Sequence, residues 1–155
     1  MTALGAFSSG DVLTAADLNA IATTSTTYTP TWASTGTQPT LGNGTLSGRY
    51  IKINKLVWVQ IFMLTGSTTT YGTGLYSWSI PSGIPARSGL FNFMSQGVGR
   101  LYDPVTGPYF GHAGFYAGST TAITLYVGNT VAQPTAPFTF TTNDEVIMTF
   151  TYEAA

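Results

Sequence analysis

Arg49-Tyr-Ile-Lys-Ile53 is followed by Asn54-Lys55 and then by Leu56-Val-Trp-Val-Gln-Ile-Phe-Met-Leu64, and this stretch decides the fold of the 155-residue chain. The first segment alternates along its length, the next two residues suit a tight turn, and the last segment is a long apolar strand. Two strands joined by two turn residues are typical of a β-hairpin. We therefore expect antiparallel strands in the body of the protein.

The second strand of this hairpin is apolar on both of its faces. Successive side chains of a strand point to opposite sides, so Leu56, Trp58 and Phe62 share one face. Val57, Val59, Ile61 and Met63 share the other. Both faces should therefore be covered, one by the opposite sheet and one by a neighbouring chain or loop. We assign the contact between subunits to Val57, Val59, Ile61 and Met63.

Strand and turn patterns continue along the rest of the chain. Segments rich in Pro, Gly, Asn and Asp separate the apolar stretches and read as turns. About eight short strands of this kind predict an all-β fold, an antiparallel β-sandwich or jelly roll. Besides the hairpin, strands are expected at residues 75–80, 90–94, 98–102, 109–116, 122–127 and 146–152.

One short helix is expected near the N-terminus, over residues 15–22. Thr14-Ala-Ala-Asp17 resembles a capping box with Asp in the place of Glu or Gln, and Leu18 and Ile21 share one helical face. Two helical turns are not stable alone in water, so the helix must dock on another surface.

A hydroxyl-rich connector, Thr23-Thr-Ser-Thr-Thr27, follows this helix. It offers no side chain for a core. The sequence therefore divides into an N-terminal docking arm, residues 1–27, with the short helix and the linker, and a β-sandwich body, residues 28–155.

The chain carries few charges. Only 7% of its residues are charged, against about 25% in an ordinary soluble domain, while 43% are apolar and the net charge is −1. The longest apolar stretch is too short for a membrane-spanning helix. Three Trp, nine Tyr and nine Phe argue against disorder. An ordered chain with an uncharged surface favours assembly with copies or partners, and we expect no membrane insertion.

Several chemistries lack the residues that they need. The chain has no Cys, and its five basic residues do not form the cluster that binds nucleic acid. His112 is the only histidine, and no Gly-x-Ser-x-Gly motif accompanies it. The acids are scattered, and neither Asp103 nor Asp144-Glu145 has the alternating oxygen ligands of a calcium loop. We expect no enzymatic activity, no metal, no cofactor and no nucleic-acid partner.

The aromatic residues suggest a second kind of function. Trp58 and Trp78 are expected in the core because of their place in apolar strands. Aromatic rings near turns can stack on sugar rings, and three tyrosines lie near predicted turns. The candidate glycan-binding residues are Tyr71, Tyr102 and Tyr109.

Several short motifs resemble segments of tailed-bacteriophage virion surface proteins, such as decoration, fibre and minor tail proteins. Phe7-Ser-Ser-Gly-Asp-Val-Leu-Thr-Ala-Ala-Asp-Leu-Asn19 resembles a segment that opens many of them. A β-rich module of such proteins is similar to four further segments in their order and spacing. These are Tyr28-Thr-Pro-Thr-Trp32, Gly42-Asn-Gly-Thr-Leu-Ser-Gly-Arg-Tyr50, Gly66-Ser-Thr-Thr-Thr70 and Thr151-Tyr-Glu-Ala154.

This resemblance implies a homotrimeric virion component whose N-terminal segment docks on the particle while its β body faces outward. It leaves open whether the particle site is the capsid or the tail. It also implies that the protein is made in the cytoplasm of the host bacterium, and the N-terminus does not read as a signal peptide. The candidate particle-docking residues are Phe7, Val12, Leu13, Leu18 and Ile21.

The resemblance, together with the low charge and the expected docking helix, therefore predicts a non-enzymatic structural protein on the surface of a tailed-phage virion, a capsid decoration or a tail or fibre component. Its partners would be copies of itself and other virion proteins. The alternative is a carbohydrate-binding module that recognises a glycan on the host surface.

Overall fold

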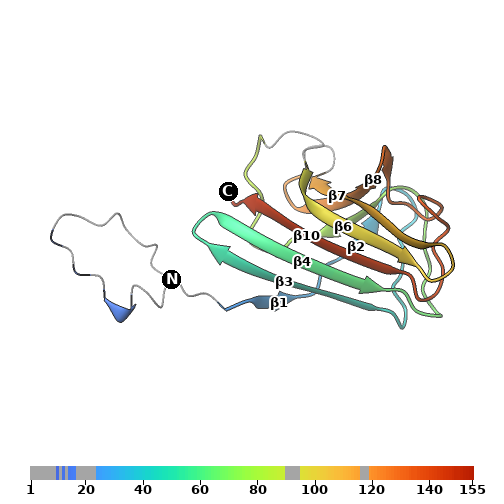
Figure 1. The fold of residues 1–155 in the computed structure, drawn as a ribbon, viewed down its shortest axis with the longest axis horizontal. Coiled ribbons are helices and arrows are strands. Elements are labelled where there is room, and N and C mark those ends of the chain that lie inside the picture. Colours follow the sequence, from blue (N-terminus) through green and yellow to red (C-terminus); the bar gives the residue numbers. More distant parts are fainter. Residues whose placement is uncertain (1–9, 11, 13, 17–23, 90–94, 116–118) are drawn as a thin grey trace.

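The computed structural model describes residues 10, 12, 14–16, 24–89, 95–115 and 119–155. Within these residues the strands form one antiparallel sheet in the order β1-β3-β4-β10-β6-β7-β8-β5-β2, with β9 paired to β8. Figure 1 shows β1, β3, β4, β10 and β6 side by side in this order. The strands are β1 (Thr26–Tyr28), β2 (Trp32–Ser34), β3 (Thr45–Ile53), β4 (Leu56–Leu64), β5 (Tyr76–Ser79), β6 (Ser95–Asp103), β7 (Gly107–Phe115), β8 (Ala122–Val127), β9 (Thr130–Val131) and β10 (Glu145–Glu153).

The expected all-β class is confirmed, and so is the central hairpin. Ile53 lies opposite Leu56 in the pairing of β3 with β4, so Asn54 and Lys55 form the two-residue turn. Asn54 has a φ of 53°, the left-handed conformation that such turns need and that Asn tolerates. The finer expectation of a sandwich or jelly roll is not confirmed, because hydrogen bonds join the strands into a single curled sheet.

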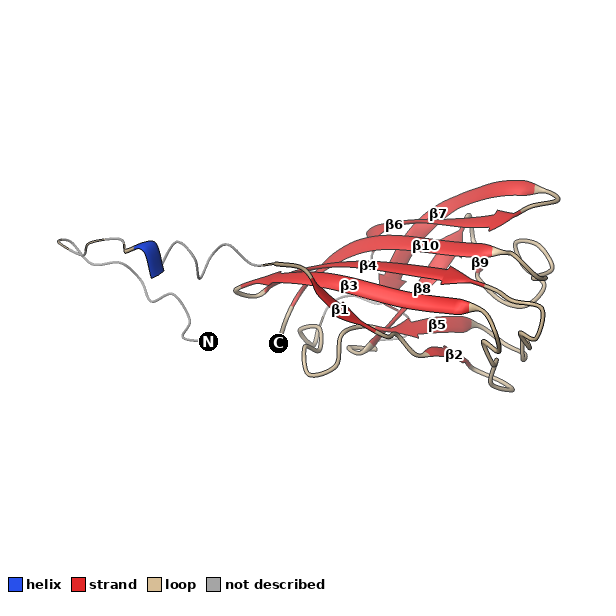
Figure 2. Ribbon diagram, turned by 90° about the horizontal axis from the view of Figure 1, so that it is seen from below, coloured by secondary structure: helices blue, strands red, loops and turns tan. Residues whose placement is uncertain are grey.

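The curl of the sheet creates an inner face that holds the core. Figure 2 shows β3 and β4 on one side of the body and β5 and β2 on the other. Between them lies an apolar cluster whose largest fully buried side chains are Trp78, Tyr76, Phe115 and Phe150. A sheet of this length curls because each strand is twisted relative to its neighbours.

The predicted subunit contact on β4 is wrong. Val57, Val59, Ile61 and Met63 each have 0% of their surface exposed within a single chain, so no second chain can reach them. The burial pattern of β4 alternates strictly, and the partly exposed face is the one that carries Trp58 and Phe62. Both faces of this strand are apolar in the sequence. The face that was expected to contact a second subunit is the one that the fold buries in the core.

The chain passes directly from one edge of the sheet to the other. β1 and β2 are the two edge strands of the main path, and only residues 29–31 separate them. Hydrogen bonds with Ser79 of β5 hold this crossing in place, one of them from the Ser79 N–H to the Thr31 carbonyl at 2.9 Å. The Tyr28 hydroxyl donates to the Ser79 carbonyl at 3.3 Å, and the Thr31 N–H donates to Ser79 Oγ at 2.8 Å. The two edges of the curled sheet are thus joined by the connecting chain and not by hydrogen bonds between paired strands.

Three predictions for other segments have different outcomes. The strand expected at 90–94 and most of the helix expected at 15–22 lie outside the described residues, although Ala15 and Ala16 are helical. The division into arm and body stays a prediction. Among the described residues, no helix is both long and apolar enough to cross a bilayer.

Candidate interaction surface

The outer face of the sheet is the largest candidate surface for function. It spans β3, β4, β10, β6 and β7, and residues paired across strands share it. One row across these strands contains Ser47, Phe62, Ile147, Arg100 and Phe110. The neighbouring rows contain Arg49, Gln60, Thr149, Val98 and His112 on one side and Thr45, Leu64, Glu145, Tyr102 and Pro108 on the other.

The β6–β7 end of this face is apolar and exposed. Phe110 has 72% of its surface exposed and Val98 has 68%, and Tyr102 and Pro108 lie in the third row of the same face. An antiparallel sheet that faces water normally carries polar side chains there. Exposed apolar clusters of this kind mark contact sites with other molecules. We call Val98, Tyr102, Pro108 and Phe110 the β6–β7 patch.

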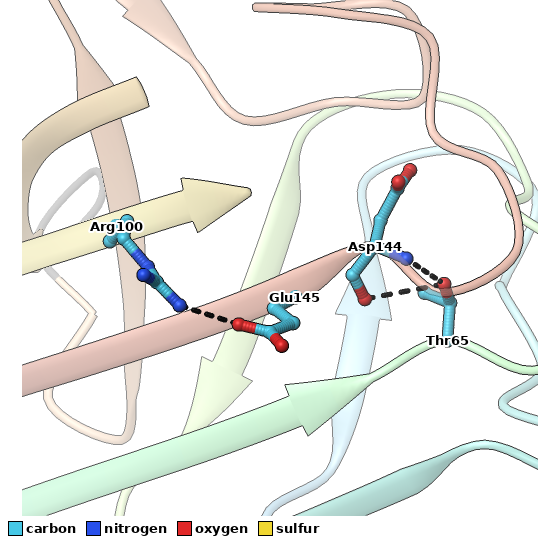
Figure 3. Close-up of polar contacts among 4 residues, drawn as sticks. All are labelled: Thr65, Arg100, Asp144 and Glu145. Carbon is cyan, nitrogen blue, oxygen red and sulfur yellow. Dashed lines mark hydrogen bonds and ion pairs between the residues drawn. The ribbon is translucent and has the colours of Figure 1, made fainter. Parts of the chain in front are cut away.

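The charges beside the β6–β7 patch are paired with each other. Arg100 on β6 forms an ion pair with Glu145 on β10, and each side chain is about one-third exposed (Figure 3). The Arg100 guanidinium carbon also lies 5.3 Å from the centre of the Tyr102 ring. The pair therefore leaves the patch electrically neutral, which lowers the cost of removing it from water.

Arg49 occupies the other end of the outer face in a different environment. Its Nε donates to Gln60 Oε1 at 2.8 Å, and its guanidinium carbon lies 5.7 Å from the centre of the Trp58 ring. In the part of the chain that the structure describes, no acidic side chain pairs with it. The guanidinium is thus held in place by a neutral amide and an aromatic ring, with its charge unneutralised.

A shallow pocket of about 200 Å³ opens beside this guanidinium. Its lining combines a cation, an amide, two hydroxyls and an aromatic ring, on strands β1, β3 and β4. We call it the Arg49 pocket, and its lining residues are Thr27, Ser47, Gly48, Arg49, Gln60 and Phe62.

A larger hollow of about 620 Å³ lies across β2, β5 and the segment after β5. Small and hydroxyl-bearing residues such as Ala33, Ser77 and Thr121 line it, and its lining contains neither a charge nor an aromatic ring. It offers little to select one ligand over another.

A buried carboxyl group lies where β10 begins. Asp144 has 0% of its surface exposed, and its Oδ2 accepts a hydrogen bond from the Thr141 N–H, while its Oδ1 is buried without a partner in the described residues. Burial is the main cause that raises the pKa of Asp144, to about 6, and the nearby Asp103 charge raises it further. The hydrogen bond from the Thr141 N–H acts in the opposite direction and lowers this pKa. Thr65 holds the main chain of Asp144 in place (Figure 3).

The three tyrosines predicted to bind a glycan do not form one platform. Tyr109 lies opposite the buried Leu101 and packs on Phe138 from the inner face, whereas Tyr102 lies on the outer face. The Tyr71 ring packs edge-on against Trp32, and its hydroxyl is buried. Because the sheet separates Tyr102 from Tyr109, a single sugar cannot contact all three.

The remaining predicted residues have mixed outcomes. His112 stacks on Tyr126 with ring centres 5.0 Å apart. Of the docking residues, Val12 is described and is 82% exposed, and the others lie outside the described part of the chain. Trp78 is fully buried as expected, but Trp58 is only half-buried, on the outer face. In that part, no group of three or more His, Asp or Glu side chains comes together to hold a metal.

Sequence reasoning missed the Arg49 pocket, although the signal was present. With Asn54 and Lys55 as the turn, Ile53 must face Leu56, and counting back along both strands places Arg49 opposite Gln60 and Ser47 opposite Phe62. The register of the hairpin therefore predicts the contact. The place of Thr27 in the lining and the depth of the pocket depend on the rest of the fold.

Comparison of the chain with protein-family models, with curated proteins and with solved structures found no match.

Proposed function

We propose that this protein is a non-enzymatic structural component on the virion surface of a tailed phage, either a capsid decoration or a tail or fibre component. Its arm, residues 1–27, would anchor it to the particle, and its sandwich-like β body would assemble with copies of itself into a homotrimer. The observation that carries this proposal is the β6–β7 patch, an exposed apolar surface on a sheet face.

The neutrality of the patch favours a second copy of this chain as the molecule that covers it. Arg100 and Glu145 neutralise each other's charge, so the covering surface needs no complementary charge. A chain with only 7% charged residues supplies such surfaces. Desolvating Val98 and Phe110 favours association by about 25 cal/mol for each Å² of apolar surface buried.

Light scattering coupled to size exclusion tests the assembly. The full-length chain and a variant lacking residues 1–22, which keeps β1, are compared. We expect the same oligomer from both, because the proposed contact lies in the body. A monomer from both at all concentrations would contradict the assembly.

Incorporation into particles tests the anchor. Virions assembled in the presence of the variant lacking residues 1–22 should not contain it, while they should contain the full-length chain. Equal incorporation would contradict the role of the arm.

A second candidate function is recognition of a carbohydrate on the host surface. The observation that favours it is the Arg49 pocket, whose lining mixes hydrogen-bonding groups with an aromatic ring. It is compatible with a place on the virion surface.

A further inference from the structure

The Arg49 guanidinium is prepared for a ligand that carries a carboxylate. Nε is engaged by Gln60, which leaves both terminal nitrogens without a hydrogen-bond partner among the described residues. Arg presents these donors as a planar fork that matches the two oxygens of a carboxylate. The contacts with Gln60 and Trp58 reduce the rotamer entropy that binding would otherwise cost.

The other lining residues of the pocket can bind groups besides a carboxylate. Thr27 and Ser47 bring hydroxyl groups, and the Gln60 amide nitrogen has two N–H donors with no partner in the described residues. Phe62 adds an aromatic ring, which is only half-buried. These groups can serve several hydroxyls and one apolar ring face on the same ligand. An Asp or Glu side chain would use the guanidinium and leave the others uncontacted.

The size of the pocket limits the ligand. Its volume of about 200 Å³ is below the range of about 300 to 1,000 Å³ that holds drug-sized molecules. One six-membered ring with its substituents matches this space, while the rest of a polymer can extend into solvent over the open side.

We propose that the Arg49 pocket binds a single carboxylated sugar unit, of the hexuronic acid class, within a host-surface polysaccharide. The Arg49 fork takes the carboxylate, Phe62 lies against the ring, and Gln60, Ser47 and Thr27 bind the hydroxyls. This inference rests on the carbohydrate-binding function proposed above and names its ligand class. It does not use the β6–β7 patch, because β6, the nearest strand of that patch, lies two strands from β4 at about 4.8 Å per strand.

The test is isothermal titration of the full-length protein with a trimer of galacturonic acid. The same trimer as its neutral methyl ester, and glutarate as a carboxylate without a sugar ring, serve as the comparison probes. We expect the acidic trimer to bind at least about tenfold more tightly than either, because only it offers both the carboxylate and the ring.

Two variants assign the binding to the pocket. Arg49→Gln removes the charge, and Gln60→Glu keeps the shape but places a carboxylate where it neutralises Arg49. Each should weaken binding of the acidic trimer by about tenfold or more with an unchanged unfolding temperature. Arg87→Gln is the matched control, because Arg87 is an exposed arginine that pairs with Glu153, and it should leave binding unchanged.

The remaining outcomes overturn the inference in distinguishable ways. Equal binding of the methyl ester would contradict the requirement for an acidic sugar, while the proposed carbohydrate-binding function would stand. Equal binding of glutarate would make the pocket a simple carboxylate site. Binding of the acidic trimer that survives both variants would place it elsewhere on the molecule, and binding of none of the three probes would contradict the proposed ligand class.

Discussion

Thr65 and Asp144 are linked by main chain and side chain together. The Thr65 N–H donates to the Asp144 carbonyl at 3.0 Å, and the Asp144 N–H donates to Thr65 Oγ1 at 2.9 Å. The same hydroxyl donates to the Thr141 carbonyl at 2.6 Å. Thr65 directly follows β4 and Asp144 directly precedes β10, so this link fixes the two central strands to each other at one end.

Replacing Thr65 by Val should destabilise the fold. The change keeps the shape but leaves the Asp144 N–H buried without its acceptor, which costs about 1 to 3 kcal/mol of the free energy of unfolding. Urea denaturation followed by tryptophan fluorescence measures it. Thr142→Val is the control, because the exposed Thr142 hydroxyl makes only a 3.4 Å hydrogen bond to Gly66, and it should change little. Equal effects of the two variants would contradict the role of Thr65.

Asp144 should make the stability of the protein fall as the solution becomes less acidic. Burial raises the pKa of Asp144 to about 6 in the folded state, so the folded protein binds this proton more tightly than the unfolded chain. Its contribution to stability is therefore complete below about pH 4, the unfolded pKa, and is lost as the pH rises through 6.

Thermal unfolding of the protein and of Asp144→Asn between pH 4 and 8 checks this. The amide cannot ionise, so the variant should gain stability relative to the native chain as the pH rises from 4 to 7, by up to about 3 kcal/mol. Asp103 does not confuse the comparison, because hydrogen bonds from Thr106 and Val105 lower its pKa and place its effect at more acidic pH. Parallel curves for the two proteins would contradict the prediction.

Neighbouring residues of β4 should respond very differently to truncation. Ile61 is fully buried on the inner face, so Ile61→Ala should reduce the free energy of unfolding by about 2 to 5 kcal/mol. Phe62 is only half-buried on the outer face, and Phe62→Ala should cost under about 1.5 kcal/mol. Chemical denaturation at low protein concentration separates this effect from assembly. A larger loss for Phe62 would reverse the assignment of the two faces.

The β6–β7 patch should control self-association without controlling the fold. Phe110→Ser removes the most exposed aromatic ring of the patch and should shift the oligomer toward monomer, while the unfolding temperature of the monomer stays within a few degrees. Val105→Ser is the control, because Val105 is 88% exposed at the β6–β7 turn but lies outside the patch. Sedimentation velocity over a range of concentrations measures both. An unchanged distribution for Phe110→Ser would exclude this contact.

Local pattern was enough to predict the hairpin and most of the other strands. The pair Asn54-Lys55 marks the turn, and its position sets the register of β3 against β4. Strand order was beyond reach, because β10 is inserted between β4 and β6 through contacts between residues far apart in sequence. The local sequence of β10 does not indicate which strands it pairs with.

The choice between the two faces of β4 failed for a related reason. Val59 and Phe62 are both apolar, and a strand pattern states only that they point to opposite sides. Which side becomes the core depends on the direction in which the whole sheet curls. The same curl places Tyr102 and Tyr109 on opposite faces, so three exposed tyrosines in the sequence did not become one site in the structure.

The short crossing from β1 to β2 has a consequence for aggregation through the edges of the sheet. An unpaired sheet edge invites pairing with another molecule, and proteins commonly prevent this with charged side chains, which are scarce in this chain. Here both edges of the main path are supplied by residues 26–34, and each edge strand is only three residues long. Neither β1 nor β2 therefore offers an extended template for fibrillar aggregation. The shortness of the two edge strands gives the protection against edge-to-edge pairing that charged side chains give in other β proteins.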